Sequence, residues 1–249
     1  MSNPISILVI NPNSSQSITD ALKPLFADVV YASTTLTFYT APPSAPSSID
    51  DAETSAQSTR ETLPDLRRFL AAHTGLPFSA YLIACYSDHP LTAALREESL
   101  VSGPVMNILE SSVLHAKKLG RPFGVVTTGT YWEPVLDVAV RAVLEQEKRG
   151  IWEGEEVEFV GVYSTGLSAL ELHTTPRAEV DGRIARAAER LFGTGARIVL
   201  LGCAGMSGME DAVRAGAGGD EDLVIINGVG VGVLLLEGLV RKKMLGGYA

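Results

Sequence analysis

Short apolar runs alternate along the chain with longer stretches in which apolar residues recur every three or four positions. Eight of the runs are rich in β-branched and aliphatic residues, as buried strands are. They cover residues 5–10, 36–39, 81–84, 105–109, 123–126, 157–163, 198–201 and 223–226. Strands that alternate with helices are typical of parallel sheets, so the pattern predicts an α/β protein.

Three segments have the clearest helix signals. One is predicted over residues 176–193 and another over 134–149, each opened by a proline, and glycines Gly193 and Gly150 stop them. The apolar stretch 229–240 contains Glu237 and is shorter than the roughly 20 residues that a bilayer span needs, so it predicts a buried helix. The proline-rich segment 41–48 predicts an extended loop.

The composition is that of a globular protein. A chain of 249 residues with 46% hydrophobic and 20% charged residues can bury a core without metals or disulfides. A net charge of -9 and a pI near 5.0 argue against nucleic-acid partners. A strand-like run begins within about five residues of Met1, which leaves no room for a signal peptide and predicts a cytoplasmic protein without membrane contact.

The two halves of the chain follow a similar pattern. The end of the first predicted strand precedes Cys85 by 75 residues, and the end of the fifth precedes Cys203 by 76. Asn107 follows the first cysteine by 22 residues, and Asn227 follows the second by 24. We therefore expect two similar lobes related by an approximate two-fold axis, although α/β units of equal length would give such spacings by chance. Each lobe would present one cysteine where parallel sheets bind ligands.

Cys85 and Cys203 each follow an apolar strand directly and precede an expected helix start. Free N–H groups at a helix start would lower a thiol pKa from about 8.5 towards neutrality. Two thiols suit inversion at a carbon, because one can remove a proton from one face while the other delivers a proton to the opposite face. The alternative is a pair of structural cysteines, since free cysteine is commonly buried and inert.

Polar residues expected at the same sheet edge are candidates to bind substrate. They are Asn11, Asn13, Ser14, Ser15, Thr127 and Thr128. Turn and N-cap roles explain Ser14 and Ser15 equally well. His89 could orient Cys85, form a nucleophilic pair with it, or be an ordinary loop residue. The histidines lack metal-ligand spacing and the glycines near Gly228 lack a dinucleotide fingerprint, so we expect neither a metal nor a cofactor.

Four motifs in this order resemble the Asp/Glu/hydantoin racemase superfamily, specifically its hydantoin and allantoin racemase branch. They are Ile10-Asn11-Pro12-Asn13-Ser14-Ser15, Ala84-Cys85-Tyr86-Ser87-Asp88, Val126-Thr127-Thr128 and Leu201-Gly202-Cys203-Ala204-Gly205-Met206. The resemblance spans nearly the whole chain. It implies two pseudo-symmetric α/β lobes, no metal or organic cofactor, and Cys85 and Cys203 as the acid/base pair. By position it also implies substrate contacts by Ser48, Ile49, Tyr86, Ser87, Asp88, Ala204 and Gly205.

The resemblance further implies that the last strand and helix return to the first lobe. We therefore expect one lobe of residues 1–98 with 216–249 that contains Cys85, and another of residues 99–215 that contains Cys203. The sequence departs from the bacterial pattern at Ser87-Asp88-His89-Pro90-Leu91 and in the proline-rich loop before Ile49. Both departures resemble fungal members associated with allantoin and nitrogen catabolism.

Three functions are compatible with these observations. The paired cysteines favour a racemase of a small molecule, namely a 5-substituted hydantoin or allantoin. A related isomerase or decarboxylase would use one cysteine, and a non-catalytic protein would close its lobes on a metabolite. Racemisation of acidic amino acids ranks lower because the motifs contain no obvious carboxylate clamp. We expect a homo-oligomer, although the apolar segments are explained first by the core.

Overall fold

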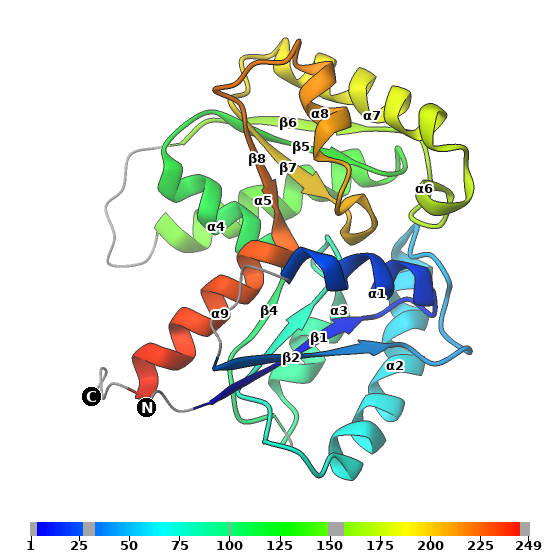
Figure 1. The fold of residues 1–249 in the computed structure, drawn as a ribbon, viewed down its shortest axis with the longest axis vertical. Coiled ribbons are helices and arrows are strands. Elements are labelled where there is room, and N and C mark those ends of the chain that lie inside the picture. The colour runs from blue at the N-terminus through cyan, green and yellow to red at the C-terminus, as the bar shows by residue number, and fades with distance from the viewer. Residues whose placement is uncertain (1–3, 27–32, 100, 149–156, 245–249) are drawn as a thin grey trace. The chain divides into compact units, whose positions relative to one another are not determined.

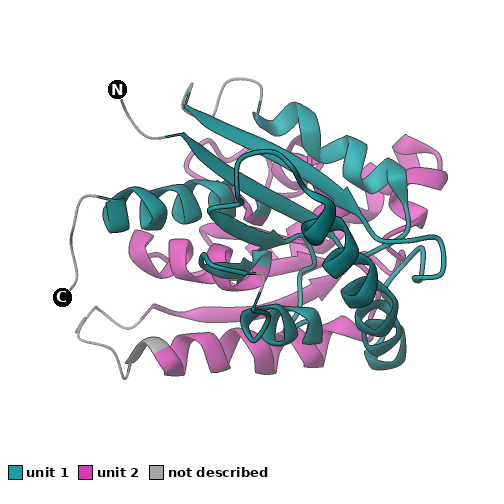
Figure 2. Cartoon of the chain, turned by 90° about the horizontal axis from the view of Figure 1, so that it is seen from below, with its two compact units in different colours: residues 1–108, 229–249 teal, residues 109–228 magenta. Residues whose placement is uncertain are grey.

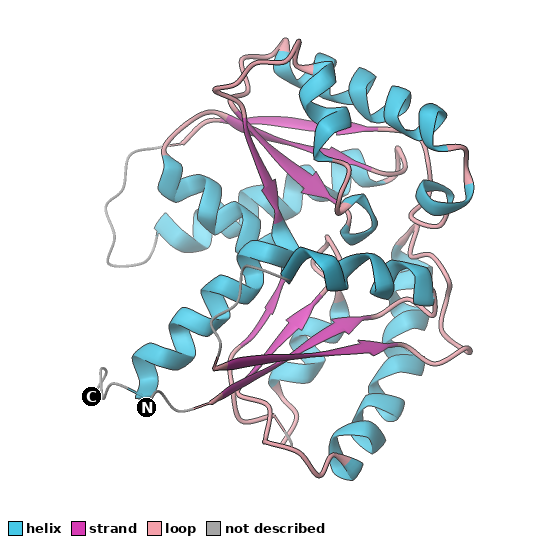
Figure 3. Cartoon of the chain, in the orientation of Figure 1, coloured by secondary structure: helices cyan, strands magenta, loops and turns pink. Residues whose placement is uncertain are grey.

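A computed structural model describes residues 4–26, 33–99, 101–148 and 157–244. The chain divides into two compact units, residues 1–108 with 229–249 and residues 109–228 (Figure 2). Each unit is built on one four-stranded parallel sheet with helices beside it (Figure 3). This confirms the α/β class and all eight expected strands.

The sheet of the first unit has the strand order β2-β1-β3-β4 (Figure 1). Its strands are β1 (Ile5–Asn11), β2 (Thr34–Thr40), β3 (Ala80–Ile83) and β4 (Val105–Asn107). Its helices are α1 (Gln16–Leu22), η1 (Lys23–Phe26), α2 (Ala52–Ala72), α3 (Pro90–Arg96) and α9 (Gly228–Met244). The central strands β1 and β3 are buried along their whole length. This explains why they are continuous apolar runs instead of alternating ones.

The sheet of the second unit has the order β6-β5-β7-β8. Its strands are β5 (Phe123–Thr127), β6 (Phe159–Ser164), β7 (Ile198–Gly202) and β8 (Val224–Asn227). Its helices are α4 (Ile108–Leu119), α5 (Trp132–Lys148), α6 (Glu171–Thr174), α7 (Arg177–Phe192), η2 (Ala204–Met206) and α8 (Glu210–Gly216). The two sheets share one topology, and the cysteines follow equivalent strands, β3 and β7.

The observed ends of the helices largely agree with those expected from proline and glycine. Helix α7 follows Pro176 and is capped by Gly193, and its buried face packs on the core of the second unit. Helix α5 begins at Trp132, two residues before the expected start, while the expected end at Arg149 and Gly150 lies outside the described residues. In the described part of the chain, no helix is long and apolar enough to cross a membrane.

The division between the units differs from the expected one. Strand β8 pairs with β7, so it belongs to the second sheet, and only α9 returns to the first unit. Strand β4 pairs with β3 and belongs to the first sheet. The boundaries therefore fall at 108/109 and 228/229, where we expected 98/99 and 215/216. An apolar run reveals a strand, but the backbone groups of its neighbours decide which sheet it joins.

Candidate active site

The carboxyl end of β1 forms a tightly bonded turn in the first unit. Asn11 is fully buried, and its Nδ2 donates to the Ser15 carbonyl and to Thr19 Oγ1, each at 3.0 Å. Its Oδ1 accepts the backbone N–H of Asn13 at 3.0 Å. Asn11 therefore organises the turn and has little capacity left for a ligand.

Asn13, unlike Asn11, keeps one polar side-chain atom without a partner among the described residues. Its side chain is 6% exposed, and its Oδ1 is buried without a hydrogen-bond partner among the described residues. A buried acceptor without a donor costs about 1–3 kcal/mol. A ligand N–H placed at Oδ1 would remove this cost.

The proline-rich loop is fixed against the same turn. The backbone N–H of Ser14 donates to the Pro46 carbonyl at 2.9 Å. Ile49 is buried, whereas Ser48 is partly exposed and its Oγ donates to Asp50 Oδ1 at 2.7 Å. The loop contains no helix or strand, as expected from its prolines.

Cys85 follows β3 and is a free thiol. The strand places it beside the β1 turn, since the Ala84 N–H donates to the Ile10 carbonyl at 2.8 Å. Cys85 packs against the hydrophobic cluster of the first unit, and its sulfur is 3.4 Å from Ser87 Oγ. Burial raises the pKa of the Cys85 thiol to about 11, and the Ser87 hydrogen bond opposes this rise.

The expectation of a lowered thiol pKa is therefore wrong for Cys85. Helix α3 begins at Pro90, five residues after the cysteine. Since proline has no N–H, the first backbone N–H of this helix is that of Leu91. The side chain of His89 already accepts this N–H. Desolvation then dominates, because no helix start stabilises the thiolate.

The three residues after Cys85 have different environments. Tyr86 and Ser87 are each 4% exposed, and Ser87 contacts the thiol. Asp88 is exposed. The structure therefore keeps Tyr86 and Ser87 beside Cys85 and turns Asp88 towards the surface of this unit.

His89, which follows β3, is a buried polar residue whose role the sequence left open. It is 1% exposed, and its Nδ1 accepts the Leu91 N–H at 3.2 Å as the N-cap of α3. This assigns the ring proton to Nε2, which is buried without a partner among the described residues. Burial lowers the pKa of His89 to about 4, so the ring is neutral at pH 7. In the sequence, the position of His89 directly before a helix-initiating proline is the only signal that could have indicated its N-cap role.

Cys203 is the second free thiol and is partly exposed. It is the N-cap of η2, and its sulfur accepts the backbone N–H of Gly205 at 3.3 Å. Hydrogen bonds donated to sulfur favour the thiolate over the thiol. The expected position at a helix start is thus confirmed for this cysteine, although the helix is a single turn.

The other expected residues of the second unit lie at the carboxyl end of β5 and in η2. Thr127 is fully buried, and its Oγ1 donates to the Gly202 carbonyl at 2.9 Å, so its hydroxyl proton joins β5 to β7. Thr128 is 4% exposed, and its carbonyl accepts the Gly166 N–H at 2.9 Å. Ala204 and Gly205 are buried in η2.

His173 is a second polar residue that sequence reasoning missed. A Cβ added at Gly205 would lie 3.1 Å from His173 Nε2, and that nitrogen is buried without a partner among the described residues. The residue lies on α6, remote in sequence from Cys203, and no motif or spacing points to it. Across the described residues, no three His, Cys, Asp or Glu side chains form a metal-binding group.

The sequence profile described as Asp/Glu/Hydantoin racemase matches residues 7–236. The chain belongs to this racemase family. "Uncharacterized protein C1F7.10" of Schizosaccharomyces pombe is 37% identical over 241 residues, covering 96% of this chain and 94% of that protein. "Hydantoin racemase" of Rhizobium meliloti is 30% identical over 248 residues, covering 98% and 90%.

Solved structures of the racemase family share the fold. The allantoin racemase from Pseudomonas fluorescens superposes with a TM-score of 0.77 at 25% identity, covering 96% of this chain and 92% of that one. The racemase fold thus places one cysteine edge in each unit of this chain. Asn13, Cys85 and His89 belong to the first unit, and Thr128 and Cys203 belong to the second.

Proposed function

We propose that the protein is a cofactor-independent racemase of a 5-substituted hydantoin or of allantoin, with Cys85 and Cys203 as its acid/base pair. The supporting observation is that each free thiol lies within two residues of the end of the equivalent strand in two sheets with the same strand order. The substrate class is suggested by the names of its relatives, a hydantoin racemase and an allantoin racemase.

The environments of the two thiols suggest their roles. The Cys203 sulfur accepts an N–H and would act as the base for one enantiomer, whereas Cys85, whose pKa is raised to about 11, would be the neutral thiol that donates a proton. The Cys203 thiolate would take the proton from the carbon beside a ring carbonyl. The C–H electron pair would then pass onto the carbonyl oxygen, giving an enolate.

The second half of the reaction returns a proton to the opposite face. The enolate electrons reform the carbonyl, the carbon takes the proton of the Cys85 thiol, and Cys85 retains the S–H electron pair as a thiolate. The product leaves Cys203 protonated. Loss of the Cys203 proton to water and return of a proton from water to Cys85 restore the starting states, and conversion of the opposite enantiomer runs the steps in reverse, so the cycle consumes no cofactor.

The two buried polar atoms of the first unit suggest how the ring is held. His89 Nε2–H would donate to a ring carbonyl, and Asn13 Oδ1 would accept a ring N–H. Amides of a hydantoin ring provide both complementary groups. A preorganised donor to a developing enolate oxygen contributes about 3 kcal/mol to the transition state.

A decarboxylase on the same scaffold is the second candidate. The neutral Cys85 thiol favours it, because a decarboxylase needs only one proton donor to quench a carbanion. The two reactions differ in mass balance. Racemisation conserves the carbon skeleton, while decarboxylation releases carbon dioxide.

The test is to incubate each enantiomer of a 5-substituted hydantoin and of allantoin with the enzyme in deuterated buffer. The optical signal and the mass are then followed together. We expect the optical signal to decay to zero from both enantiomers, with one deuterium entering the product. Loss of mass as carbon dioxide would replace the racemase with the decarboxylase. Saturable binding without optical change or exchange would indicate a non-catalytic binding protein.

We also propose that the racemase works as a homo-oligomer. Helix α9 exposes Leu234, Leu239 and Met244 by 43–49% of their surface. Burial of these side chains against a second copy of the chain would remove their apolar surface from water. Sedimentation equilibrium tests this, and a monomer at micromolar concentration would contradict it.

A further inference from the structure

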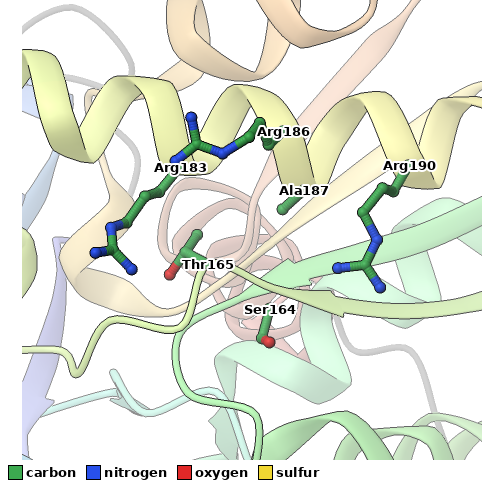
Figure 4. Close-up of a pocket in the computed structure, with 6 residues that line it drawn as sticks. All are labelled: Ser164, Thr165, Arg183, Arg186, Ala187 and Arg190. Carbon is green, nitrogen blue, oxygen red and sulfur yellow. The ribbon is translucent and has the colours of Figure 1, made fainter.

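A pocket lies in the second unit between α7 and the end of β6, and its volume is about 250 Å³. It is lined by Ser164, Thr165, Arg183, Arg186, Ala187 and Arg190 (Figure 4). The three arginines are spaced three and four residues apart, which places them on one face of α7. None of the residues proposed for proton transfer lines this pocket.

Two of the guanidinium groups are held in place by neighbours. Arg183 donates from Nε and Nη2 to Glu179 Oε1 at 3.2 and 2.9 Å. Its Nη1 is left on the side of Gly166, where an added Cβ would lie 3.7 Å away. The guanidinium of Arg190 stacks over the Tyr163 ring, 4.8 Å from its centroid. In Figure 4, Arg183 and Arg190 extend from α7 on either side of Ser164 and Thr165.

The pocket has an excess of positive charge. The described residues provide no carboxylate partner for Arg186 or Arg190. Glu179 is paired with Arg183, and Glu133 Oε1 accepts the Ser164 N–H and Oγ–H at 2.8 Å each. Like charges at this spacing on a helix repel one another, so a bound anion would stabilise the arrangement. The cluster contrasts with the net charge of -9 of the whole chain.

We propose that this pocket binds a small phosphate-bearing anion, either inorganic phosphate or a phosphomonoester. Guanidinium forks match phosphate oxygens in bidentate pairs, and two of the three forks here are already oriented. The hydroxyl proton of Ser164 is committed to Glu133, so the arginines supply the binding energy. The volume leaves room for a short organic group beside the phosphate.

The pocket is connected to the carboxyl edge of the second sheet. The Thr165 N–H donates to the Thr127 carbonyl, and the Gly166 N–H donates to the Thr128 carbonyl, each at 2.9 Å. Thr165 lines the pocket, and Gly166 lies beside Arg183 with a φ of 76°. An anion held by the arginines would thus fix the turn that supports Thr127 and Thr128, and the site is suited to regulation by a phosphorylated metabolite.

The experiment is isothermal titration of the full-length protein with inorganic phosphate and with glycerol 3-phosphate, at constant ionic strength. The variant is Arg186→Gln with Arg190→Gln. The control is Arg177→Gln, which lies on the same helix, pairs with Asp181 at 2.6 Å and does not line the pocket. Both double-variant positions are exposed, so the fold should be kept, and circular dichroism checks this.

We expect saturable binding that weakens by at least about tenfold in the double variant and by less than about twofold in the control. Tighter binding of glycerol 3-phosphate than of phosphate would assign the ligand to phosphomonoesters, and equal binding would assign it to phosphate itself. Binding that is unchanged in the double variant would overturn the proposal, as would no binding of either probe at about 10 mM. Neither outcome depends on racemase activity.

Discussion

Gly205 donates its backbone N–H to the sulfur of Cys203 at 3.3 Å. The equivalent cysteine of the first unit meets a side-chain hydroxyl instead of a backbone N–H, since its sulfur lies 3.4 Å from Ser87 Oγ and packs against a hydrophobic cluster. Two cysteines in equivalent positions of two similar sheets therefore have different environments. The difference suits a reaction in which one cysteine accepts a proton while the other donates one.

Thiol reactivity should differ between the two sites. The thiolate is the reactive species, and burial raises the pKa of Cys85 to about 11, so this thiol stays neutral at pH 7.5. We expect iodoacetamide to modify Cys203 first, and Cys85 only as the pH approaches 11. Peptide mapping by mass spectrometry measures both rates. Faster modification of Cys85 than of Cys203 at pH 7.5 would contradict the raised pKa of Cys85.

Replacement of either cysteine should stop inversion. In Cys85→Ser and in Cys203→Ser a hydroxyl replaces a proton-transfer group, which should lower the racemisation rate by about 10²–10⁴-fold. Exchange of the substrate proton with deuterated solvent should persist from one enantiomer only, a different one for each variant. Circular dichroism and mass spectrometry follow the two signals. Full racemase activity in either variant would exclude the two-base scheme.

Protein stability should decrease with acidity because of His89. Its pKa is about 4 in the folded state and 6.5 when unperturbed, so between these pH values the unfolded chain binds more protons. Stability is then fully present above pH 6.5 and is lost as the pH falls towards 4, by up to about 3 kcal/mol. Urea unfolding from pH 4 to 7 measures the slope. The slope should flatten in His89→Gln, and an equal slope in the variant would rule out this histidine as its cause.

A side chain at Gly202 should disturb the cysteine that follows it. A Cβ there would lie 2.6 Å from Val125 Cγ1 and 2.8 Å from the Val126 carbonyl oxygen. We expect Gly202→Ala to cost about 1–3 kcal/mol of unfolding free energy. The control is Gly238→Ala in α9, where the added methyl meets open space and should stabilise by about 0.5–1 kcal/mol. Urea denaturation measures the free energy of unfolding of both variants. An unchanged value for Gly202→Ala would show that β5 and β7 can move apart to accept the methyl group.

Removal of Arg241, the ion-pair partner of the buried Glu237 in α9, should lower the stability of the protein. Glu237 is 1% exposed, and its Oε1 accepts hydrogen bonds from Arg241 at 2.8 Å and from Thr34. In Arg241→Met the carboxylate loses its charge partner inside the first unit, which should cost about 3 kcal/mol. The exposed pair of Arg177 and Asp181 is the control, and Arg177→Met should cost at most about 1 kcal/mol. Equal losses in thermal unfolding would contradict this ranking.

Much of the fold could be predicted from the sequence because its signals are local. Apolar runs such as 5–10 and 198–201 form strands, since a parallel sheet covered on both faces needs continuous apolar residues. Proline and glycine defined the ends of α7 within a residue or two. The position of each cysteine directly after a strand is also a local property.

Some features were decided only by the tertiary structure. Strand β8 joined β7, not the first sheet, because pairing depends on backbone groups far away in the chain. The environment of Cys85, the fully bonded amide of Asn11 and the unpartnered nitrogen of His89 each depend on which distant atoms surround the group. Hydrophobic period therefore determined which segments form strands and helices, whereas burial, and with it the charge states of the candidate site, followed only from three-dimensional packing.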